Sequence, residues 1–313
     1  MAERDRRRTR GRDRRRGRSR SAAAERAAAR GRSRRREGRQ PSGRDGELRA
    51  RVLWALLPAA FGIFIIAEGG LVFALGISVL GILALHEWYT LTRSVRPVDV
   101  AGFLALLGVV LGALFGTHFH VVLALAAAFP VTYAIAVARP WRDHVAWAVA
   151  ITLFGVLWVG LPLAHAVLLR ELHHGGALLV DALIGTFIGD SAAYSVGKAW
   201  GRRKLAPRVS PNKTWEGLIA GILVGTFAVW AFEAAYQEFM SAAHAILIGL
   251  AVTVAAPVGD LFESLIKRDL EVKDTGGLLG PHGGVLDRLD AVFFSVPVAY
   301  YVSLAILPAS VIR

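Results

Sequence analysis

Residues 98–138 read VDVAGFLALLGVVLGALFGTHFHVVLALAAAFPVTYAIAVA, and Asp99 is the only side chain among them with a full charge. A short polar break around Thr117 divides this stretch into two apolar runs, 98–115 and 120–138. A helix rises about 1.5 Å per residue, so about 20 apolar residues cross the ~30 Å hydrocarbon core of a bilayer. The stretch therefore predicts two consecutive transmembrane helices.

Similar apolar runs recur through the rest of the chain, which is 54% hydrophobic and only 19% charged over 313 residues. This composition excludes an ordinary soluble domain. The chain has no Cys, which excludes disulfides, thiolate metal sites and thiol nucleophiles. We expect an all-α polytopic integral membrane protein with about nine transmembrane helices, near 52–67, 70–91, 98–115, 120–138, 145–168, 177–197, 214–232, 242–257 and 291–310.

The N-terminal segment differs from this body in its charge. Residues 1–51 contain 21 Arg, no Lys and 7 acidic residues, whereas the remainder holds 16 basic and 17 acidic side chains. A segment with almost no large apolar residue cannot bury enough surface to fold. We predict a disordered basic cytoplasmic tail over 1–50 and a transmembrane domain over 51–313. A nucleic-acid arm, a lipid tether and a topology signal are the alternatives for the tail; we expect contact with anionic membrane lipids and none with nucleic acid.

The basic residues of the loops predict the orientation of the body. With the tail taken as cytoplasmic, loops rich in Arg and Lys alternate along the chain with loops that hold few or none. This alternation follows the positive-inside rule for nine spans. The two long polar loops, 198–213 and 258–290, then lie on the cytoplasmic side, where nucleotides are found.

The 258–290 loop carries the clearest chemistry. Seven of the 17 acidic residues outside the tail lie in it. On a helix, Asp260, Ser264 and Lys267 would share one face with Glu263 beside them. Carboxylate oxygens on separate helix ends are ligands that Mg²⁺ prefers. The loop also holds cationic side chains that suit phosphates and glycines where a backbone could approach an anion; these are Lys267, Arg268, Lys273, Arg288, Gly276, Gly277, Gly280, Gly283 and Gly284. Together they predict a metal–phosphate site, with a solvated salt-bridged loop as the alternative.

The other cytoplasmic loop has matching features. Asp190 lies inside an apolar span, where an ionisable side chain is costly and suggests a function. Ser210-Pro211 is typical of an N-cap followed by the first helical residue, so we expect a helix to begin there. Its N-terminus, with Lys213 beside it, is a candidate anion site. Glu87, near the cytoplasmic end of its span, is a candidate interfacial anchor or partner of the site residues.

Residues 264–290 resemble the signature of the phosphatidate cytidylyltransferases (CDP-diacylglycerol synthases). The matching run is S-x-I-K-R-x4-K-D-x-G-x2-L-G-x-H-G-G-V-x-D-R-L-D, from Ser264 to Asp290. Two further segments, D-S-x-A-Y from Asp190 and S-P-x-K-T-x-E-G from Ser210, are similar to that family as well. The resemblance covers the chain from about residue 50 to its C-terminus, so it excludes the tail.

The resemblance implies the reaction CTP + phosphatidate → CDP-diacylglycerol + pyrophosphate, part of phospholipid biosynthesis, at the bacterial inner membrane. It also implies Mg²⁺ at the acids Asp260 and Asp287, with K⁺ as a candidate second metal. The expected catalytic residues are Asp260, Lys267, Arg268, Asp287 and Asp290. The expected substrate-binding residues are Asp190, Ser210, Lys213, Ser264, Lys273, Asp274, His282, Gly283, Gly284 and Arg288. A homodimer is a candidate assembly.

Three other functions remain as alternatives at this point. A CTP-dependent polyprenol kinase or a cytidylyltransferase for another lipid phosphate would use the same scaffold. A transporter would instead place its charges near the bilayer midplane, in two related halves. The chain shows no internal repeat and its charges concentrate in two loops on one side, which argues against transport.

Overall fold

The structure is a computed structural model that describes residues 57–140, 144–236, 239–277 and 283–309. The predicted tail lies outside the described residues. An apolar helix at Leu57–Glu68 comes first. It is followed by α3 (Gly70–Leu91), α4 (Asp99–Phe115), α5 (His118–Ala138), α6 (Val145–Gly155), α7 (Leu161–Arg170) and α8 (Gly175–Trp200). A hairpin of β1 (Lys204–Ala206) and β2 (Ser210–Thr214) then leads to α9 (Trp215–Tyr236), α10 (Ala242–Asp269), α11 (Leu286–Leu289) and α12 (Val292–Ile306).

The helical membrane fold predicted from the sequence is confirmed, and each predicted span has a counterpart. Seven stretches in the described part of the chain are long and apolar enough to cross a membrane. One of them joins α6 and α7 through a π-helical turn at Val156–Gly160, and another joins α11 and α12. The counterparts of predicted spans 52–67 and 98–115 are the shorter apolar helices Leu57–Glu68 and Asp99–Phe115. The predicted count of nine is therefore approximate.

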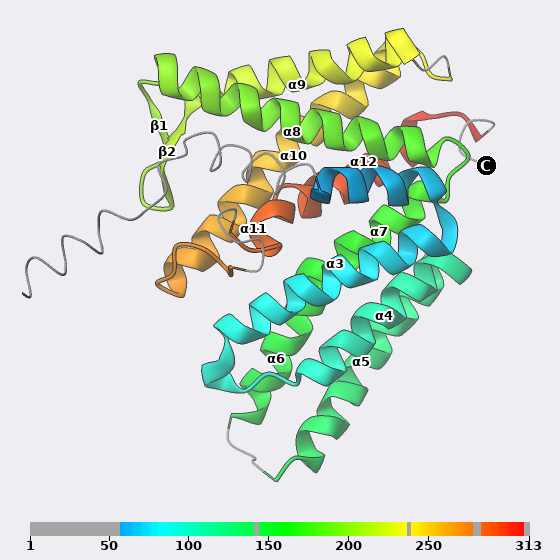
Figure 1. The fold of residues 1–313 in the computed structure, drawn as a ribbon, viewed down its shortest axis with the longest axis vertical. Coiled ribbons are helices and arrows are strands. Elements are labelled where there is room, and N and C mark those ends of the chain that lie inside the picture. Colours follow the sequence, from blue (N-terminus) through cyan, green and yellow to red (C-terminus); the bar gives the residue numbers. More distant parts are fainter. Residues whose placement is uncertain (1–56, 141–143, 237–238, 278–282, 310–313) are drawn as a thin grey trace, which may run out of the picture. The chain divides into compact units, whose positions relative to one another are not determined.

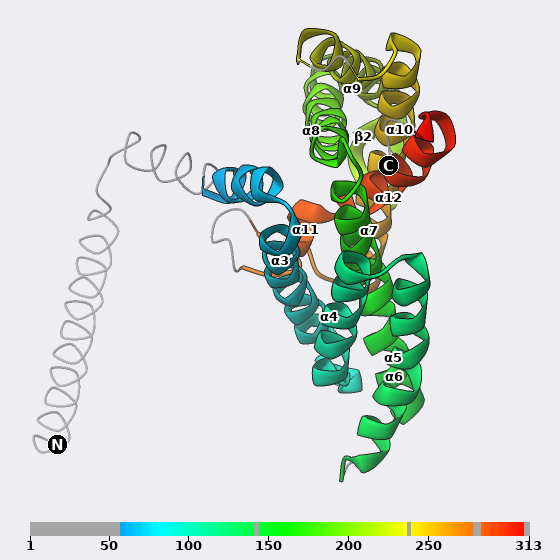
Figure 2. The same cartoon turned by 90° about the vertical axis from the view of Figure 1, so that its right-hand side faces the viewer.

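The helices form two groups, which Figures 1 and 2 show from two sides. One group contains α3 to α7, and the other contains α8, α9 and α10. Helix α12 packs on both groups, because it contacts α7 as well as α8 and α10. Its buried side chains Phe293 and Val296 belong to the same apolar core as Leu106 of α4 and Leu163 of α7.

Helices α8 and α9 pack unusually closely because glycines line their contact. A Cβ atom added at Gly221 of α9 would lie 2.8 Å from the carbonyl oxygen of Gly189 on α8. One added at Gly225 would lie 2.8 Å from the carbonyl oxygen of Gly185. Small residues at such interfaces let helix backbones approach each other within a membrane. The two helices and the hairpin between them thus form one tightly packed unit.

The structure corrects the predicted helix start at Ser210-Pro211. These residues belong to β2, which pairs antiparallel with β1, and helix α9 begins at Trp215. The Thr214 hydroxyl accepts a hydrogen bond from the backbone N–H of Gly217 at 3.2 Å, as an N-cap side chain does. A capping signal therefore exists in this segment, but it lies at Thr214, four residues later than predicted.

The structure also shortens the predicted 258–290 loop, because α10 continues to Asp269. Two hydrogen bonds end this helix: Glu271 N–H donates to the Arg268 carbonyl, and Val272 N–H donates to the Lys267 carbonyl at 2.9 Å. This is the Schellman pattern, which places one residue in the left-handed region. Here that residue is Glu271, with φ 56°, instead of the usual glycine.

Candidate active site

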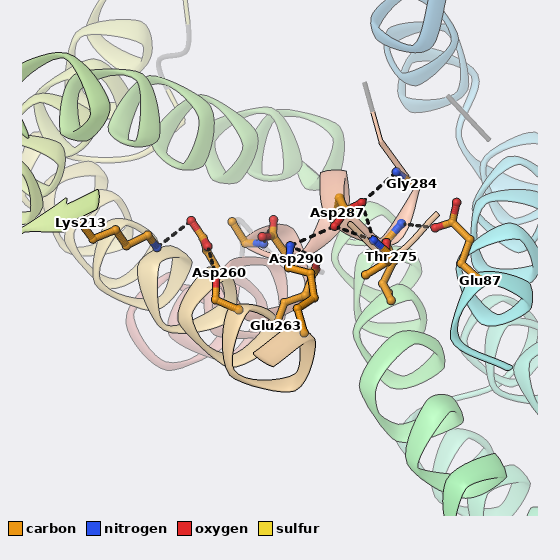
Figure 3. A network of polar contacts seen from close by, with 12 residues as sticks. Glu87, Lys213, Asp260, Glu263, Thr275, Gly284, Asp287 and Asp290 are labelled. Carbon is orange, nitrogen blue, oxygen red and sulfur yellow. Dashed lines mark hydrogen bonds and ion pairs between the residues drawn. The ribbon is translucent and has the colours of Figure 1, made fainter. Parts of the chain in front are cut away.

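The chemistry-bearing residues of the two predicted loops meet at one end of the helices. The C-terminal parts of α8 and α10, the β1–β2 hairpin, α11 and the C-terminal end of α3 all contribute. Figure 3 shows the labelled side chains in a row that runs from Lys213 to Glu87. Segments far apart in the sequence thus supply one polar network.

Lys267 of α10 lies at the centre of this network. Its Nζ donates to Glu263 Oε1 at 2.9 Å, one helical turn away, and to Asp287 Oδ1 of α11 at 2.9 Å. The Glu263 side chain is completely buried and that of Lys267 is 16% exposed. Since a buried carboxylate is costly without a partner, the ammonium group stabilises both acids where they lie.

The backbone also holds Asp287. Its carboxylate accepts N–H bonds from Thr275 at 3.0 Å and from Gly284 at 2.9 Å, as well as the bond from Lys267. These donors come from both sides of the glycine-rich segment. Gly283 has φ 82°, a conformation that favours glycine, so this residue permits the turn before Gly284. Asp287 therefore connects the glycine-rich segment, of which residues 275–277 and 283–284 are described, to helix α10.

A second ion pair lies at the hairpin end of the row. Lys213 Nζ of β2 is 2.6 Å from Asp260 Oδ2, and the Ser264 hydroxyl donates to Asp260 Oδ1 at 3.3 Å. The hairpin is attached to α10 once more by Arg268, whose Nε donates to the Val209 carbonyl at 3.2 Å. Lys213 was predicted to lie at a helix N-terminus; it lies in a strand and faces an acid.

Asp190 and Asp290 add further negative charge beside Asp260. The three carboxylates are near enough for their charges to interact with one another. Asp290 also accepts an N–H bond from Ala291 at 2.7 Å. A Cβ atom at Gly259 would collide with the Asp290 carbonyl, so α10 packs directly on this turn. The structure thus brings together acids that the sequence placed in a span and in a loop.

The remaining predicted residues surround this cluster or lie elsewhere. Arg268, Lys273, Asp274 and Arg288 are exposed. Ser210 is half-buried at the start of β2. Predicted His282 lies outside the described residues. The residues of the central row are therefore buried or half-buried, whereas Arg268, Lys273 and Arg288 are exposed.

The chemistry of these residues fits a divalent cation. Three carboxylates with interacting charges, Asp190, Asp260 and Asp290, offer the oxygen ligands that Mg²⁺ prefers. Glu263 Oε2 is buried nearby, and no hydrogen-bond partner for it lies among the described residues. Within the described ranges, no group of three or more Asp, Glu or His side chains is arranged so that it could hold a metal ion as it stands. Asp287 is occupied by Lys267 and backbone N–H groups, so it would have to exchange one of them to bind a metal.

The sequence did not reveal how three acidic residues are used. Glu87 of α3 accepts N–H bonds from Val285 and Leu286, about 200 residues away in the chain. Glu263 is the buried partner of Lys267, which its i, i+4 spacing would have indicated. Asp181 of α8 is fully buried, and neither carboxylate oxygen has a hydrogen-bond partner among the described residues. The sequence could have indicated Asp181, because it is an acidic residue inside an apolar run.

Comparison with known proteins bears on the identity of this site. Residues 49–306 match the model of the cytidylyltransferase family. A protein of Bacillus subtilis named phosphatidate cytidylyltransferase is 31% identical over 269 residues, which cover 82% of this chain and 97% of that protein. One of the same name from Pseudomonas aeruginosa is 33% identical over 266 residues, covering 80% and 95%. A third, from Mycobacterium leprae, is 38% identical over half of each chain.

Proposed function

The chain belongs to the cytidylyltransferase family, and we propose that it acts as a phosphatidate cytidylyltransferase, which makes CDP-diacylglycerol and pyrophosphate from CTP and phosphatidate. The similarity over four fifths of the chain to two bacterial proteins of that name carries this proposal. The resemblance of residues 264–290 to the family signature supports it independently of overall identity.

The reaction asks the protein to bring two polyanions together. A phosphate oxygen of phosphatidate attacks the α-phosphorus of CTP, and the bond between that phosphorus and the β-phosphate oxygen breaks, so pyrophosphate leaves with the electron pair. The attacking oxygen is already anionic, so neither a covalent enzyme intermediate nor a strong base is required. Positioning and charge neutralisation are the protein's main contributions.

The basic residues of the site suit those two tasks. Lys213 and Lys267 lie within the acidic row, and each is held in place by an ion pair. Exposed Arg268, Lys273 and Arg288 lie at the edge, where phosphates of an incoming nucleotide or lipid headgroup would arrive. Arg offers a planar fork of donors to phosphate, and Lys offers a point charge.

Magnesium is the proposed cofactor, with K⁺ as the candidate second ion. Asp260 and the neighbouring acids Asp190 and Asp290 would hold Mg²⁺, and the predicted participation of Asp287 stays a prediction. When bound, the ion would neutralise charge on the phosphates of CTP. The residues of the chain still have to orient the two substrates, and Lys267 forms ion pairs with Glu263 and Asp287 without the metal.

The proposed location is the bacterial cell membrane, with the site and the N-terminus on the cytoplasmic side. The ends of α3, α8 and α10 that carry the site face the same way along the bundle as the loops rich in Arg and Lys. CTP is a cytoplasmic substrate, which agrees with this orientation. Contact of the tail with anionic lipids and homodimer formation remain predictions.

The test is turnover by the purified full-length protein in detergent, with CTP and phosphatidate, with and without Mg²⁺. We expect Mg²⁺-dependent formation of CDP-diacylglycerol and pyrophosphate in equal amounts. Asp287→Asn should lower turnover by about 10²–10³-fold, because it weakens the tie between Lys267 and the glycine-rich segment. Glu68→Gln, a change of an exposed acid outside the site, is the matched control and should leave turnover unchanged.

Other products would point to other functions. Consumption of CTP only with a polyprenol, with release of CDP, would support a lipid kinase on the same scaffold. Turnover with a different lipid phosphate would change the proposed substrate. A well-folded preparation that makes no product with any lipid would contradict the proposal and favour transport.

A further inference from the structure

Glu87 is a buried carboxylate that the proposed chemistry does not use directly. Its side chain is 3% exposed, on the last turns of α3. Oε1 accepts the N–H of Val285 at 3.0 Å, and Oε2 accepts the N–H of Leu286 at 2.9 Å. Both oxygens of one carboxylate are thus bound to two consecutive backbone amides immediately before Asp287. Figure 3 shows Glu87 at the end of the row, beside Thr275 and Gly284.

Two glycines close around this carboxylate. A Cβ atom added at Gly276 would lie 2.5 Å from Glu87 Oε1, and one added at Gly284 would lie 2.5 Å from Oε2. Gly276 and Gly284, which precede and follow residues 278–282, therefore both lie so close to Glu87 that a residue with a side chain would not fit. Contact with Glu87 therefore requires glycine at both positions.

Glu87 and Asp287 hold the same segment from opposite sides. Asp287 accepts the N–H groups of Thr275 and Gly284, and Glu87 accepts those of Val285 and Leu286. Four backbone donors are thereby fixed by two carboxylates that come from α3 and α11. The backbone next to Asp287 is thereby attached to α3. Glu87 is the residue of α3 that Figure 3 labels.

We propose that Glu87 is a positioning residue that fixes Asp287 against Lys267 and so sets the rate of turnover more than the affinity for substrate. This inference rests on the proposed function for its kinetic part. A displacement of about 1 Å at a catalytic group can cost about 10²-fold in rate. Glu87 is too deeply buried to contact phosphates itself, so its effect passes through the segment that it holds.

The test is Glu87→Gln in the full-length protein. Glutamine keeps one acceptor oxygen and replaces the other with an NH₂ group, which cannot accept the second N–H. We expect kcat to fall about 10–100-fold while KM for CTP changes less than about threefold. Glu87→Asp keeps both acceptors on a shorter side chain and should recover part of the lost kcat. Glu233→Gln, which also alters a buried Glu that accepts a backbone N–H, is the matched control and should leave both constants unchanged.

A second measurement does not depend on activity. Amide hydrogen exchange should become at least about tenfold faster in peptides that cover 283–289 of Glu87→Gln, with unchanged exchange in α9. Unchanged exchange in 283–289 would overturn the proposal, as would equal kcat for the variant and the wild type. If Glu87→Gln fails to fold, Glu87→Asp replaces it in both measurements: a kcat below that of wild type with faster exchange in 283–289 supports the proposal, and equality with wild type in either measurement overturns it. If wild type makes no product, the proposed function fails, while exchange still decides whether Glu87 holds this segment.

Discussion

Helix α8 carries two acids inside its apolar span, Asp181 and Asp190, and their surroundings are opposites. Asp190 is half-buried and lies near enough to Asp260, Asp290 and Lys213 for their charges to interact. Asp181 is fully buried, and no described residue hydrogen-bonds to either of its oxygens. The charge that acts on Asp181 is that of another acid, Glu233 of α9.

The difference shows that intramembrane position alone does not identify a working carboxylate. Removing a charge from water costs free energy at both residues, and more at Asp181, which is fully buried. At Asp190, side chains from β2, α10 and the turn before α12 meet, and Lys213 provides positive charge. At Asp181, the second acid adds repulsion. We therefore predict a function for Asp190 and expect Asp181, together with Glu233, to reduce stability.

The largest expected effect comes from removing the central cation of the site. Lys267→Met leaves Glu263 and Asp287 without their shared partner, so turnover should fall about 10²–10³-fold. Breaking such a buried pair also costs about 3–5 kcal/mol of stability. Turnover and the midpoint of thermal unfolding in detergent measure the two effects.

Two further variants separate these effects of Lys267. Adding Glu263→Gln to Lys267→Met removes one uncompensated charge, so it should recover stability without recovering turnover. Lys198→Met, a change of an exposed lysine in the last turn of α8, serves as control. Recovery of turnover in the double variant would mean that Lys267 has only a structural role.

A smaller effect is expected from the hairpin. Lys213→Gln removes the partner of Asp260, and we expect turnover to fall about 10–100-fold. Stability should change by about 1 kcal/mol or less, because the side chains of this pair are 25% and 32% exposed. Steady-state kinetics compared with Lys204→Gln, an exposed lysine of the same hairpin, measure the difference. Equal turnover in both variants would show that Lys213 does not contribute to the reaction.

The smallest effect on turnover is expected at Asp181. Asp181→Leu removes two buried oxygen atoms that have no described hydrogen-bond partner, so turnover should stay within about twofold of wild type, and stability should rise by about 1–3 kcal/mol. The midpoint of thermal unfolding checks this. A large loss of turnover would erase the contrast between Asp181 and Asp190 and give Asp181 a function.

The sequence predicted the membrane helices well because long apolar runs have few alternatives to a helix in a bilayer. It misplaced the start of α9 because Ser210-Pro211 resembles a cap, whereas pairing with β1 makes these residues a strand. It ended the membrane helix before Asp260 because hydropathy marks only the apolar part of α10, and Glu271 replaces the glycine that usually signals a helix end.

The predicted site residues were placed together by chemistry and spacing, and the structure gathers most of those it describes at one end. The spacing of Asp260, Ser264 and Lys267 on one helical face was sufficient for α10, since that contact is local. The sequence offered Glu87 as an interfacial anchor or a partner of the site residues, but it could not show which amides the carboxylate binds, because they lie about 200 residues later. A contact between one side chain and distant backbone amides produces no periodic pattern in the sequence.

The glycine contacts between α8 and α9 have a consequence for how the chain assembles during synthesis. Synthesis proceeds from the N-terminus, so α8, the hairpin and α9 exist before α10 is made. A short link between two closely packing helices costs little closure entropy, so this unit can form early. In the folded chain Lys213 lies near enough to Asp190 for their charges to interact, and the ribosome makes Asp260 and Asp290 after both of them. The positive charge therefore enters the membrane interface ahead of most of the negative charge that it later offsets.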